Sequence, residues 1–322
     1  MSKPIGWAIV GASGWADSTF GPAIAAANNA DFVGAVGSDI TKTKAYTAKH
    51  GARMAYPSLK EMLADEAVQA VWIATPNHMH ADMAVAALEA GKHVLVEKPM
   101  ALTAAEAERM KAISRKADRL LSIGYHIRQH PDHQEIHRRW TAGDFGDPVQ
   151  VRAHLFFGYP DLPARWRLQK ETSGSWVLGD VGTHLIDHLI WFLGKPADTH
   201  GYVSSPRFQV ESGDHGVVVV RFENGGLGIA ESSVGAPGKG PRFEFYGTRG
   251  FAILEGTAFG ESGTVATGDL AGGPQQTETE TLNLYQAQAE AFGRAIAGEE
   301  TALATPDDGI RNMEIIEAAR GW

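Results

Sequence analysis

Short apolar runs alternate with amphipathic stretches over the first 125 residues of the chain. Runs rich in β-branched and aromatic residues predict buried strands at residues 5–10, 32–37, 70–75, 93–96 and 120–123. The stretches between them predict helices at residues 41–50, 58–65, 78–90 and 104–117. Strands that are separated by helices are joined by crossover connections, which give a parallel sheet. We therefore expect residues 1–125 to form an α/β domain with a doubly wound parallel sheet of the Rossmann type.

The pattern changes after residue 126. A helix is predicted at residues 133–142, and a Gly-rich turn then leads into longer strands at 149–157, 216–222, 228–234, 242–246 and 251–255. Turns such as Asn-Gly-Gly at 224–226 are typical of antiparallel hairpins. Further helices are predicted at 176–192, 285–297 and 307–319, and the Gly-, Thr- and Ala-rich segment 256–276 is expected to be a surface excursion. Residues 126–322 are thus predicted to form an α+β domain with a mostly antiparallel sheet.

The first predicted strand is followed by Gly-Ala-Ser-Gly-Trp-Ala at the start of a helical stretch. A dinucleotide-binding turn has the pattern G-x-G-x-x-G/A, whose glycines permit a tight turn and a close approach to the pyrophosphate. Here a serine takes the middle glycine position, where its hydroxyl can donate to a phosphate oxygen. The candidate cofactor-binding residues of this turn are Gly11, Ser13, Gly14, Trp15 and Ala16. An ordinary strand-to-helix turn is the alternative interpretation.

The end of the second predicted strand bears on the choice between NAD and NADP. An acidic residue there usually holds the ribose hydroxyls of NAD and repels the 2′-phosphate of NADP. Asp39 lies one residue beyond the expected position, which Ser38 occupies, and Lys42 follows where it can pair with a 2′-phosphate. The two signals conflict, so NAD and NADP both stay open. Asp39 can alternatively cap the helix that follows.

Polar residues also follow the strands at 70–75 and 93–96. Ligands of open α/β sheets bind outside such strand ends. A lysine held at this edge of the sheet can stabilise charge on a substrate oxygen. The candidates at these two strand ends are Thr75, Pro76, Asn77, His80, Glu97 and Lys98.

Asp180 and His184 lie four residues apart within the predicted helix at 176–192, so we expect them to share one helical face. A histidine with an ordinary pKa of ~6.5 can deliver a proton near neutral pH. The aspartate can hold a substrate hydroxyl. These two residues and Lys98 are the candidate catalytic residues, and the alternative is that His184 only packs within its helix.

Four histidines, at positions 126, 130, 133 and 137, recur at helical spacings, and histidines on one helical face can bind zinc. Pro131 interrupts the register between the first two and the last two, and the helix that carries His133 and His137 reads as solvated. We therefore predict no metal site. His126 is expected instead at the lip of the cofactor site, where it contacts substrate or nicotinamide.

Trp166 and Arg167 lie in a loop after the strand at 149–157. An arginine beside an aromatic ring can bind sugar hydroxyls or an acidic group of a substrate. We therefore take both as candidate substrate contacts. The alternative is a surface cation packed on the indole ring.

Several of these segments resemble the glucose–fructose oxidoreductase/inositol dehydrogenase (Gfo/Idh/MocA) family. The resemblance rests on G-A-S-G-W-A, A-T-P-N-H-x-H, A-G-K-H-V-L-V-E-K-P-M-A-L-T, G-D-F-G-D-P and D-V-G-T-H-L-I-D, which follow one another in this order over nearly the whole chain. Within the family, the Trp-Arg-Leu segment at 166–168 and the serine variant of the glycine loop look like the anhydrofructose reductase branch.

The resemblance implies a Rossmann domain followed by an open-faced sheet domain for substrate binding and oligomerisation, with the substrate over the nicotinamide of NAD(P). It also implies that Lys98 contacts the reacting oxygen and that Asp180 and His184 complete the site. The activity expected is hydride transfer between nicotinamide and a carbon of a sugar, ketosugar or polyol. An NAD-dependent glycosidase of the same fold and a dinucleotide-binding regulator without turnover are the alternatives.

Composition and charge narrow the choice of partners and compartment. The 322 residues carry a net charge of −9, which disfavours nucleic acid and anionic membranes as partners. The sequence has no cysteine, which excludes disulfides and thiolate metal sites. No run approaches the ~20 apolar residues of a membrane span, and the N-terminus has no secretory pattern. We expect a cytoplasmic enzyme with a carbohydrate substrate. A homodimer through the C-terminal sheet and a monomer both stay open.

Overall fold

The computed structural model describes residues 3–12, 14–238, 240–269 and 271–321, and its contacts divide the chain into two compact units. The first unit comprises residues 1–101, 105–129 and 283–306. The second comprises residues 102–104, 130–282 and 307–322. Within the described residues, no helix is long and apolar enough to cross a membrane.

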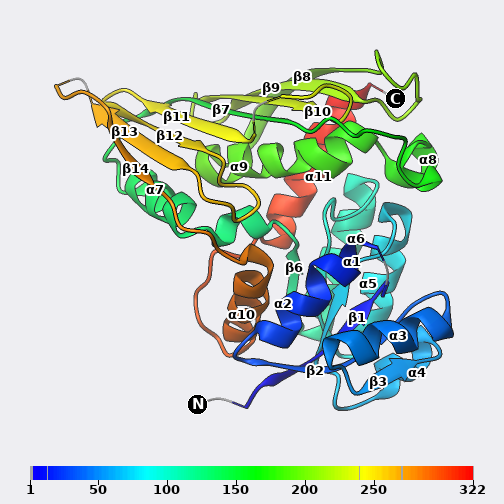
Figure 1. Ribbon diagram of the computed structural model, residues 1–322. Coiled ribbons are helices and arrows are strands. Elements are labelled where there is room, and N and C mark those ends of the chain that lie inside the picture. Colours follow the sequence, from blue (N-terminus) through cyan, green and yellow to red (C-terminus); the bar gives the residue numbers. More distant parts are fainter. Residues whose placement is uncertain (1–2, 13, 239, 270, 322) are drawn as a thin grey trace. The chain divides into compact units, whose positions relative to one another are not determined.

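The sheet of the first unit has six parallel strands (Figure 1). They are β1 (Ile5–Val10), β2 (Ala30–Val36), β3 (Met54–Tyr56), β4 (Ala70–Ile73), β5 (His93–Val96) and β6 (Leu121–Ile123). Their order, β3-β2-β1-β4-β5-β6, reverses direction between β1 and β4, where doubly wound sheets bind their ligands. The predicted Rossmann sheet is therefore confirmed. The prediction missed β3 because its three residues, Met-Ala-Tyr, are too few to show a pattern.

The helices of this unit are α1 (Trp15–Ser18), α2 (Phe20–Ala26), α3 (Ile40–His50), α4 (Leu59–Ala64), α5 (His80–Glu89), α6 (Ala104–Ala117) and α10 (Leu284–Ile296). The helical stretch after β1 is interrupted at Thr19, whose φ of −124° and ψ of −61° end α1 before α2 begins. Pro22 explains the interruption, because proline has no N–H to donate and its ring clashes with the carbonyl four residues earlier.

The first unit also includes α10, which the sequence assigned to the second domain. The ring of Phe292 lies 5.1 Å from that of Trp7 in β1, and the ring of Tyr285 lies 5.5 Å from that of Phe20 in α2. Trp7, Phe20 and Phe292 belong to one buried core. This helix therefore completes the hydrophobic core of the Rossmann sheet, although it follows the second sheet in the chain.

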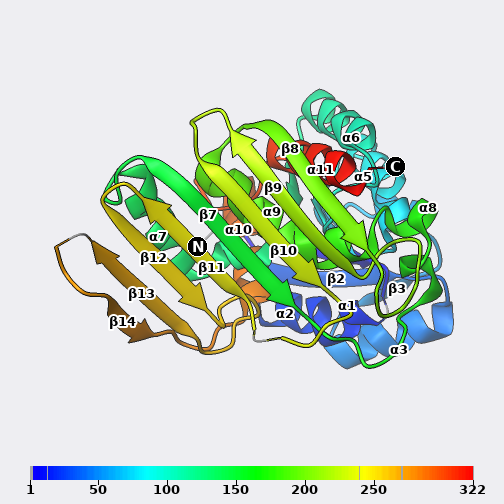
Figure 2. The same cartoon turned by 90° about the horizontal axis from the view of Figure 1, so that it is seen from above.

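The second unit is built on an eight-stranded sheet (Figure 2). Its strands are β7 (Pro148–Phe156), β8 (Pro196–Ser204), β9 (His215–Phe222), β10 (Leu227–Ser233), β11 (Arg242–Gly247), β12 (Gly250–Glu255), β13 (Thr264–Asp269) and β14 (Gln275–Glu278). They follow the order β14-β13-β12-β11-β7-β10-β9-β8, and every pair is antiparallel except β7 with β10. The prediction of a mostly antiparallel sheet is confirmed.

Helices cover one face of this sheet, as Figures 1 and 2 show. The helices of the unit are α7 (Pro131–Thr141), α8 (Lys170–Ser173), α9 (Thr183–Leu193) and α11 (Pro306–Arg320). A Cβ atom on Gly228 of β10 would lie 2.9 Å from Leu189 Cδ1, so the absence of a side chain there lets α9 pack closely on the sheet. On the strands, buried positions such as Val151, Ala153 and Leu155 alternate with more exposed ones.

The edge strands of the second sheet were not predicted. The segment 256–276 was expected to be a surface excursion, but β13 lies within it and β14 begins at its end. The residues of β14 are all exposed, and β8 has no buried residue, so neither shows the alternation of a half-buried strand. β14 pairs with β13 in a hairpin and β8 pairs with β9, so these strands are defined by their hydrogen-bonded pairing and not by a buried face.

Candidate active site

In the turn after β1, the backbone of one glycine lies very close to the end of a neighbouring strand. Gly11 has a φ of +101°, and a Cβ atom there would lie 2.6 Å from the carbonyl oxygen of Ala74, at the end of β4. Gly14 has a φ of +56°, and no described heavy atom comes within 4 Å of a Cβ built on it. Trp15 is 56% exposed and Ala16 is buried. The proposed phosphate contact Ser13 lies outside the described residues. This open glycine turn fits a dinucleotide.

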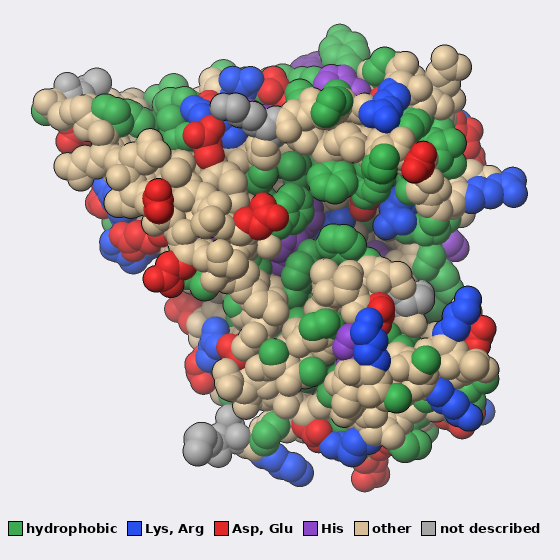
Figure 3. Space-filling model, in the orientation of Figure 1, with side chains coloured by type: hydrophobic (Ala, Val, Ile, Leu, Met, Phe, Trp, Pro, Cys, Tyr) green, Lys and Arg blue, Asp and Glu red, His purple; other side chains and the backbone are tan. Residues whose placement is uncertain are grey.

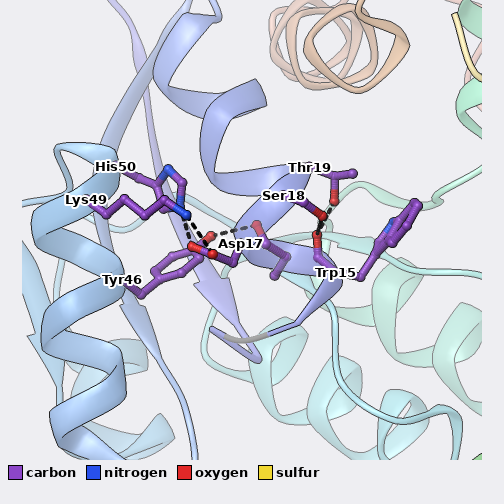
Figure 4. A network of polar contacts seen from close by, with 8 residues as sticks. Trp15, Asp17, Ser18, Thr19, Tyr46, Lys49 and His50 are labelled. Carbon is purple, nitrogen blue, oxygen red and sulfur yellow. Dashed lines mark hydrogen bonds and ion pairs between the residues drawn. The ribbon is translucent and has the colours of Figure 1, made fainter. Parts of the chain in front are cut away.

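A network of polar contacts fixes the short helix that follows the glycine turn (Figure 4). Asp17 Oδ2 lies 2.7 Å from Lys49 Nζ, and Asp17 Oδ1 lies 2.8 Å from His50 Nε2. The hydroxyl of Tyr46 donates to the carbonyl of Ala16 over 3.3 Å. The hydrogen bond from Lys49 lowers the pKa of Asp17. These contacts attach α1 to α3, and sequence reasoning missed them because no motif links positions 17 and 49.

The candidate residues after β2, Ser38, Asp39 and Lys42, are all exposed, but one of them has a clear structural role. Asp39 Oδ1 accepts hydrogen bonds from the N–H groups of Thr41, over 2.8 Å, and Lys42, over 3.1 Å, so it caps α3. The alternative interpretation of Asp39 as a cap is therefore observed. Within the described residues, Oδ2 of the same carboxylate has no hydrogen-bond partner. Capping thus leaves Asp39 one oxygen for another ligand, and Ser38 lies beside it.

Two loops at the carboxyl edge of the sheet are joined by a buried histidine. His80, 1% exposed, has Nδ1 at 2.8 Å from the carbonyl oxygen of Pro99 and Nε2 at 2.9 Å from that of Thr75. Burial lowers the pKa of His80 to about 4. The histidine therefore ties the loop after β4, with Pro76 and the buried Asn77, to the loop after β5. Its role is to hold these loops rather than to bind metal.

Glu97 and Lys98 have different environments although they are neighbours. The Glu97 carboxylate is buried and its Oε1 accepts a hydrogen bond of 3.0 Å from Trp72 Nε1 in β4. A Cβ atom on Gly124 would lie 2.7 Å from that same oxygen. Lys98 is half-buried and follows directly after the strand and this anchored glutamate. Glu97 thus fixes the strand end from which Lys98 emerges.

His126 differs from the expectation that it lies at the lip of the cofactor site. It begins a 3-10 turn, His126–Gln129, and is only 1% exposed. Its ring packs on Tyr285 of α10, with centroids 4.3 Å apart. The ring of Tyr285 comes from a helix more than 150 residues later in the sequence, so a local pattern does not contain this contact.

In the second unit, the structure brings together three residues that were predicted from separate observations. Arg167 Nε lies 3.2 Å from Asp180 Oδ2, and the two side chains are 26% and 19% exposed, respectively. The guanidinium also lies over the ring of Trp166, 4.4 Å from its centroid. The hydroxyl of Ser212 donates to the carbonyl of Arg167 over 2.8 Å, which anchors the 3-10 turn Arg165–Arg167.

Tyr159 joins these residues and was missed from the sequence. Burial and the negative charge of Asp180, with a hydrogen bond to that carboxylate, raise the pKa of the Tyr159 hydroxyl to about 12. The aromatic run Phe-Phe-Gly-Tyr at 156–159 was the available signal, but it did not show which ring meets the aspartate. We call Tyr159, Trp166, Arg167 and Asp180 the Asp180 cluster. Its charged, hydroxyl and aromatic groups suit a polyhydroxylated ligand.

His184 is the second residue of α9 and is 4% exposed. The preceding turn, Leu178–Gly182, is π-helical, and the N–H of Thr183 donates to the carbonyl of Leu178, five residues earlier. Asp180 therefore lies in a wider turn than the regular helix on which the spacing argument relied. Asp180 and His184 belong to the second unit, whereas Lys98 belongs to the first.

The recurring histidines have partners other than a metal. His130 caps α7 through Nδ1, which accepts from the N–H of Asp132 over 3.2 Å. His133 is fully buried, which corrects the expectation of a solvated position. The ring of His137 stacks on that of Trp191, with centroids 4.3 Å apart. Within the described residues, no group of three or more His, Cys, Asp or Glu side chains could hold a metal ion.

Comparison with known families accounts for both units. Residues 5–125 match the model described as "Oxidoreductase family, NAD-binding Rossmann fold", and residues 133–253 match that described as "GFO/IDH/MocA C-terminal domain". The chain belongs to the GFO/IDH/MocA family. The predicted resemblance is thereby confirmed, and so is a dinucleotide cofactor for the first domain of this GFO/IDH/MocA protein.

Individual relatives cover nearly the whole chain. It is 30% identical over 310 residues to a 1,5-anhydro-D-fructose reductase of Ensifer adhaerens, covering 95% of this chain and 92% of that protein. It is 27% identical to a scyllo-inositol 2-dehydrogenase (NADP+) of Bacillus subtilis (strain 168), covering 81% and 78% of the two chains. The structure of aldose-aldose oxidoreductase from Caulobacter crescentus, complexed with glycerol, superposes with a TM-score of 0.88 at 25% identity, covering 98% and 96%.

Proposed function

We propose that this GFO/IDH/MocA protein is an NAD(P)-dependent oxidoreductase that transfers a hydride between nicotinamide and a carbon of a sugar, ketosugar or polyol. The observation that carries the proposal is the Asp180 cluster, in a family whose first domain binds NAD. The Arg167–Asp180 pair offers hydrogen bonds to hydroxyls, and the indole ring of Trp166 beside Arg167 offers an apolar surface to the C–H groups of a sugar ring. A relative named 1,5-anhydro-D-fructose reductase makes an anhydroketosugar the first substrate to assay.

The residues of the first unit fit the cofactor. Gly11 lets the turn pack closely on the end of β4, Gly14 leaves space for a pyrophosphate, and Ala16 is buried in the helix that follows. We propose Ser13, Trp15, Ser38, Asp39, Lys42, Thr75, Pro76, Asn77, Glu97 and Lys98 as the further cofactor-binding set, with His80 holding two of its loops. When bound, the dinucleotide supplies or accepts the hydride. The ratio of kcat/KM for NADPH and NADH distinguishes NADP from NAD as the cofactor.

Five residues are proposed to act on the substrate. The ammonium group of Lys98 stabilises negative charge on the reacting oxygen. The imidazole of His184 gives that oxygen its proton in reduction and takes it in oxidation. Asp180 and Arg167 hold further hydroxyls, and Trp166 covers the sugar ring. His126, which is buried against Tyr285, is proposed to hold α10 against the turn His126–Gln129 rather than to bind the sugar.

The uncovered face of the second sheet and the composition of the protein bear on its assembly and compartment. On the uncovered face of the second sheet, Arg152 Nη2 lies 2.9 Å from Glu231 Oε2, and Arg242 pairs with Glu244 and Glu255. Light scattering distinguishes a monomer from a dimer through this face. We propose a cytoplasmic location, because the absence of cysteine fits a reducing compartment, in which disulfides do not form. Acidic and basic side chains are interspersed on the face shown in Figure 3.

The test is a steady-state assay of NADPH and NADH oxidation against a panel of ketosugars, with sugar and polyol oxidation as the reverse reaction. We expect stoichiometric consumption of one dinucleotide with at least one ketosugar. His184→Asn should reduce turnover by about 10²–10⁴ and remove one limb of the pH profile. Sugar cleavage without net oxidation of the dinucleotide would support a glycosidase instead, and binding without turnover would support a regulator.

A further inference from the structure

A chain of buried polar side chains leads to the main-chain oxygen of His184. The Thr257 Oγ1 atom lies 2.7 Å from His133 Nε2, and His133 Nδ1 lies 3.0 Å from His188 Nε2. His188 Nδ1 in turn lies 3.2 Å from the carbonyl oxygen of His184. Thr257, His133 and His188 are each 0% exposed, and they come from the loop after β12, from α7 and from α9.

The carbonyl group at the end of the chain fixes the direction of every hydrogen bond. A carbonyl oxygen only accepts, so His188 must carry its proton on Nδ1. In a neutral His188 ring, Nε2 is then unprotonated, and it accepts a hydrogen bond from the Nδ1–H of His133. The same reasoning leaves Nε2 of His133 bare, so the Thr257 hydroxyl donates to it. All donors thus point from Thr257 towards His184, and each ring uses both of its nitrogens.

The surroundings favour neutral rings. The ring of Phe243 lies 5.0 Å from His133 and 4.5 Å from His188. Burial, reinforced by the neighbouring histidines His188 and His130, holds the pKa of His133 well below its ordinary value. His130 accepts from the N–H of Asp132 through Nδ1. The hydrogen-bonded series from Thr257 to His184 therefore has a single arrangement of hydroxyl and imidazole protons at neutral pH.

We propose that Thr257, His133 and His188 are positioning residues that fix the proton-transferring His184 in place. A main-chain oxygen within an α-helix ordinarily accepts from the N–H four residues later. The ring of His188 adds a second donor to that oxygen from the same residue. This matters at position 184, because the backbone pattern has just changed from the π-helical turn Leu178–Gly182 to the regular helix α9. The role of His184 itself rests on the proposed function.

The direction of the hydrogen bonds is tested first, in the unmodified protein and without any assay of activity. Long-range ¹H–¹⁵N NMR spectra of the imidazole rings report which nitrogen carries the proton. We expect His133 and His188 both to be protonated on Nδ1 and bare on Nε2 at pH 7. A proton on Nε2 of either ring would overturn the inference. A variant that fails to fold does not affect this measurement.

The effect on His184 is tested with a matched pair of variants. Thr257→Val keeps the shape of the side chain and removes the hydroxyl, whereas Thr257→Ser keeps the hydroxyl. We expect Thr257→Val to shift the imidazole signals of His184 and to lower kcat about tenfold to a hundredfold with little change in KM for the dinucleotide, because small misplacements of reacting groups have effects of this size. Thr257→Ser should restore both readouts.

The outcomes separate this inference from the proposed function. Unchanged His184 signals in Thr257→Val would overturn the positioning role, whatever the activity. Equal loss of kcat in the valine and serine variants would do the same, because the effect would then come from packing rather than from the hydroxyl. Failure of the wild-type protein to oxidise or reduce any dinucleotide would contradict the proposed function, while the NMR readouts would still decide the hydrogen-bond chain.

Discussion

Nε of Arg167 lies 3.2 Å from Oδ2 of Asp180, although the two residues belong to different secondary-structure elements and neither charge is fully exposed. Removing one partner of such a pair leaves the other without compensation. The relationship also explains why a substrate hydroxyl would find both a donor and an acceptor at one place.

Arg167→Gln should raise the KM for the sugar about tenfold to a hundredfold and change kcat much less, since hydrogen bonds to charged groups contribute ~1.5–3 kcal/mol. Arg165→Gln is the matched control, because Arg165 lies in the same 3-10 turn but is exposed. Steady-state kinetics with varied sugar checks the prediction. An unchanged KM in the Arg167 variant would mean that the pair only stabilises the fold.

Lys98→Met should lower kcat by roughly 10²–10³, because electrostatic stabilisers of a developing oxyanion have effects of that size. The dissociation constant of the dinucleotide, measured by calorimetry, should change far less, since Glu97 and not Lys98 anchors the strand end through Trp72. The exposed Lys60→Met is the control for loss of a positive charge. Turnover within a few-fold of wild type would remove Lys98 from the reaction.

The cap at Asp39 permits a cleaner test of cofactor choice than a simple deletion. Asp39→Asn keeps an oxygen for the N–H groups of Thr41 and Lys42 and removes the charge. We expect it to raise the kcat/KM for NADP(H) relative to NAD(H) without lowering Tm. Asp39→Ala should also lose ~0.5–2 kcal/mol of stability with the cap. If the cofactor ratio is the same in all three proteins, the carboxylate serves α3 alone.

Acid should destabilise the fold through its buried histidines. Burial lowers the pKa of His80 and of His93 to about 4 and holds that of His133 well below its ordinary value. Below the ordinary histidine pKa of ~6.5, the unfolded protein therefore binds more protons than the folded protein. Their contribution is complete above pH 6.5 and is lost as the pH falls towards the folded pKa.

For each such group, the free energy of unfolding should fall by up to ~1.4 kcal/mol per pH unit as the pH is lowered. Urea unfolding between pH 7 and pH 5 measures this slope. His80→Gln should reduce this slope, and the exposed His200→Gln should not. Equal free energies of unfolding at both pH values would show that these rings are protonated in the folded protein.

Local patterns predicted most of the fold. The bounds of β1, β5 and α6 agree with those predicted, because each is a buried run or a long amphipathic stretch. The edge strands β8 and β14 have no buried residue that a hydrophobic pattern could show. The packing of α10 depends on distant partners, which a local pattern does not contain. Likewise, the helical spacing of 180 and 184 did not reveal the π-helical turn.

The same limit applies to the site. Motifs identified the glycine turn and the residues of the Asp180 cluster except Tyr159, whose partner Asp180 comes 21 positions later. The histidine pattern identified His133 but not its burial, because the covering ring of Phe243 lies in a strand more than 100 residues away. Composition and spacing show which groups are present, and only the fold shows which of them are neighbours.

The most direct measurement follows deuterium from a dinucleotide labelled at both C4 hydrogens into the sugar. The reaction is run with NADPH and with NADH on the ketosugar panel, and the products are analysed by mass spectrometry. Hydride transfer predicts that each oxidised dinucleotide places one deuterium on a carbon of a reduced sugar. A product sugar without deuterium, or no oxidation of either dinucleotide by any substrate of the panel, would contradict the account.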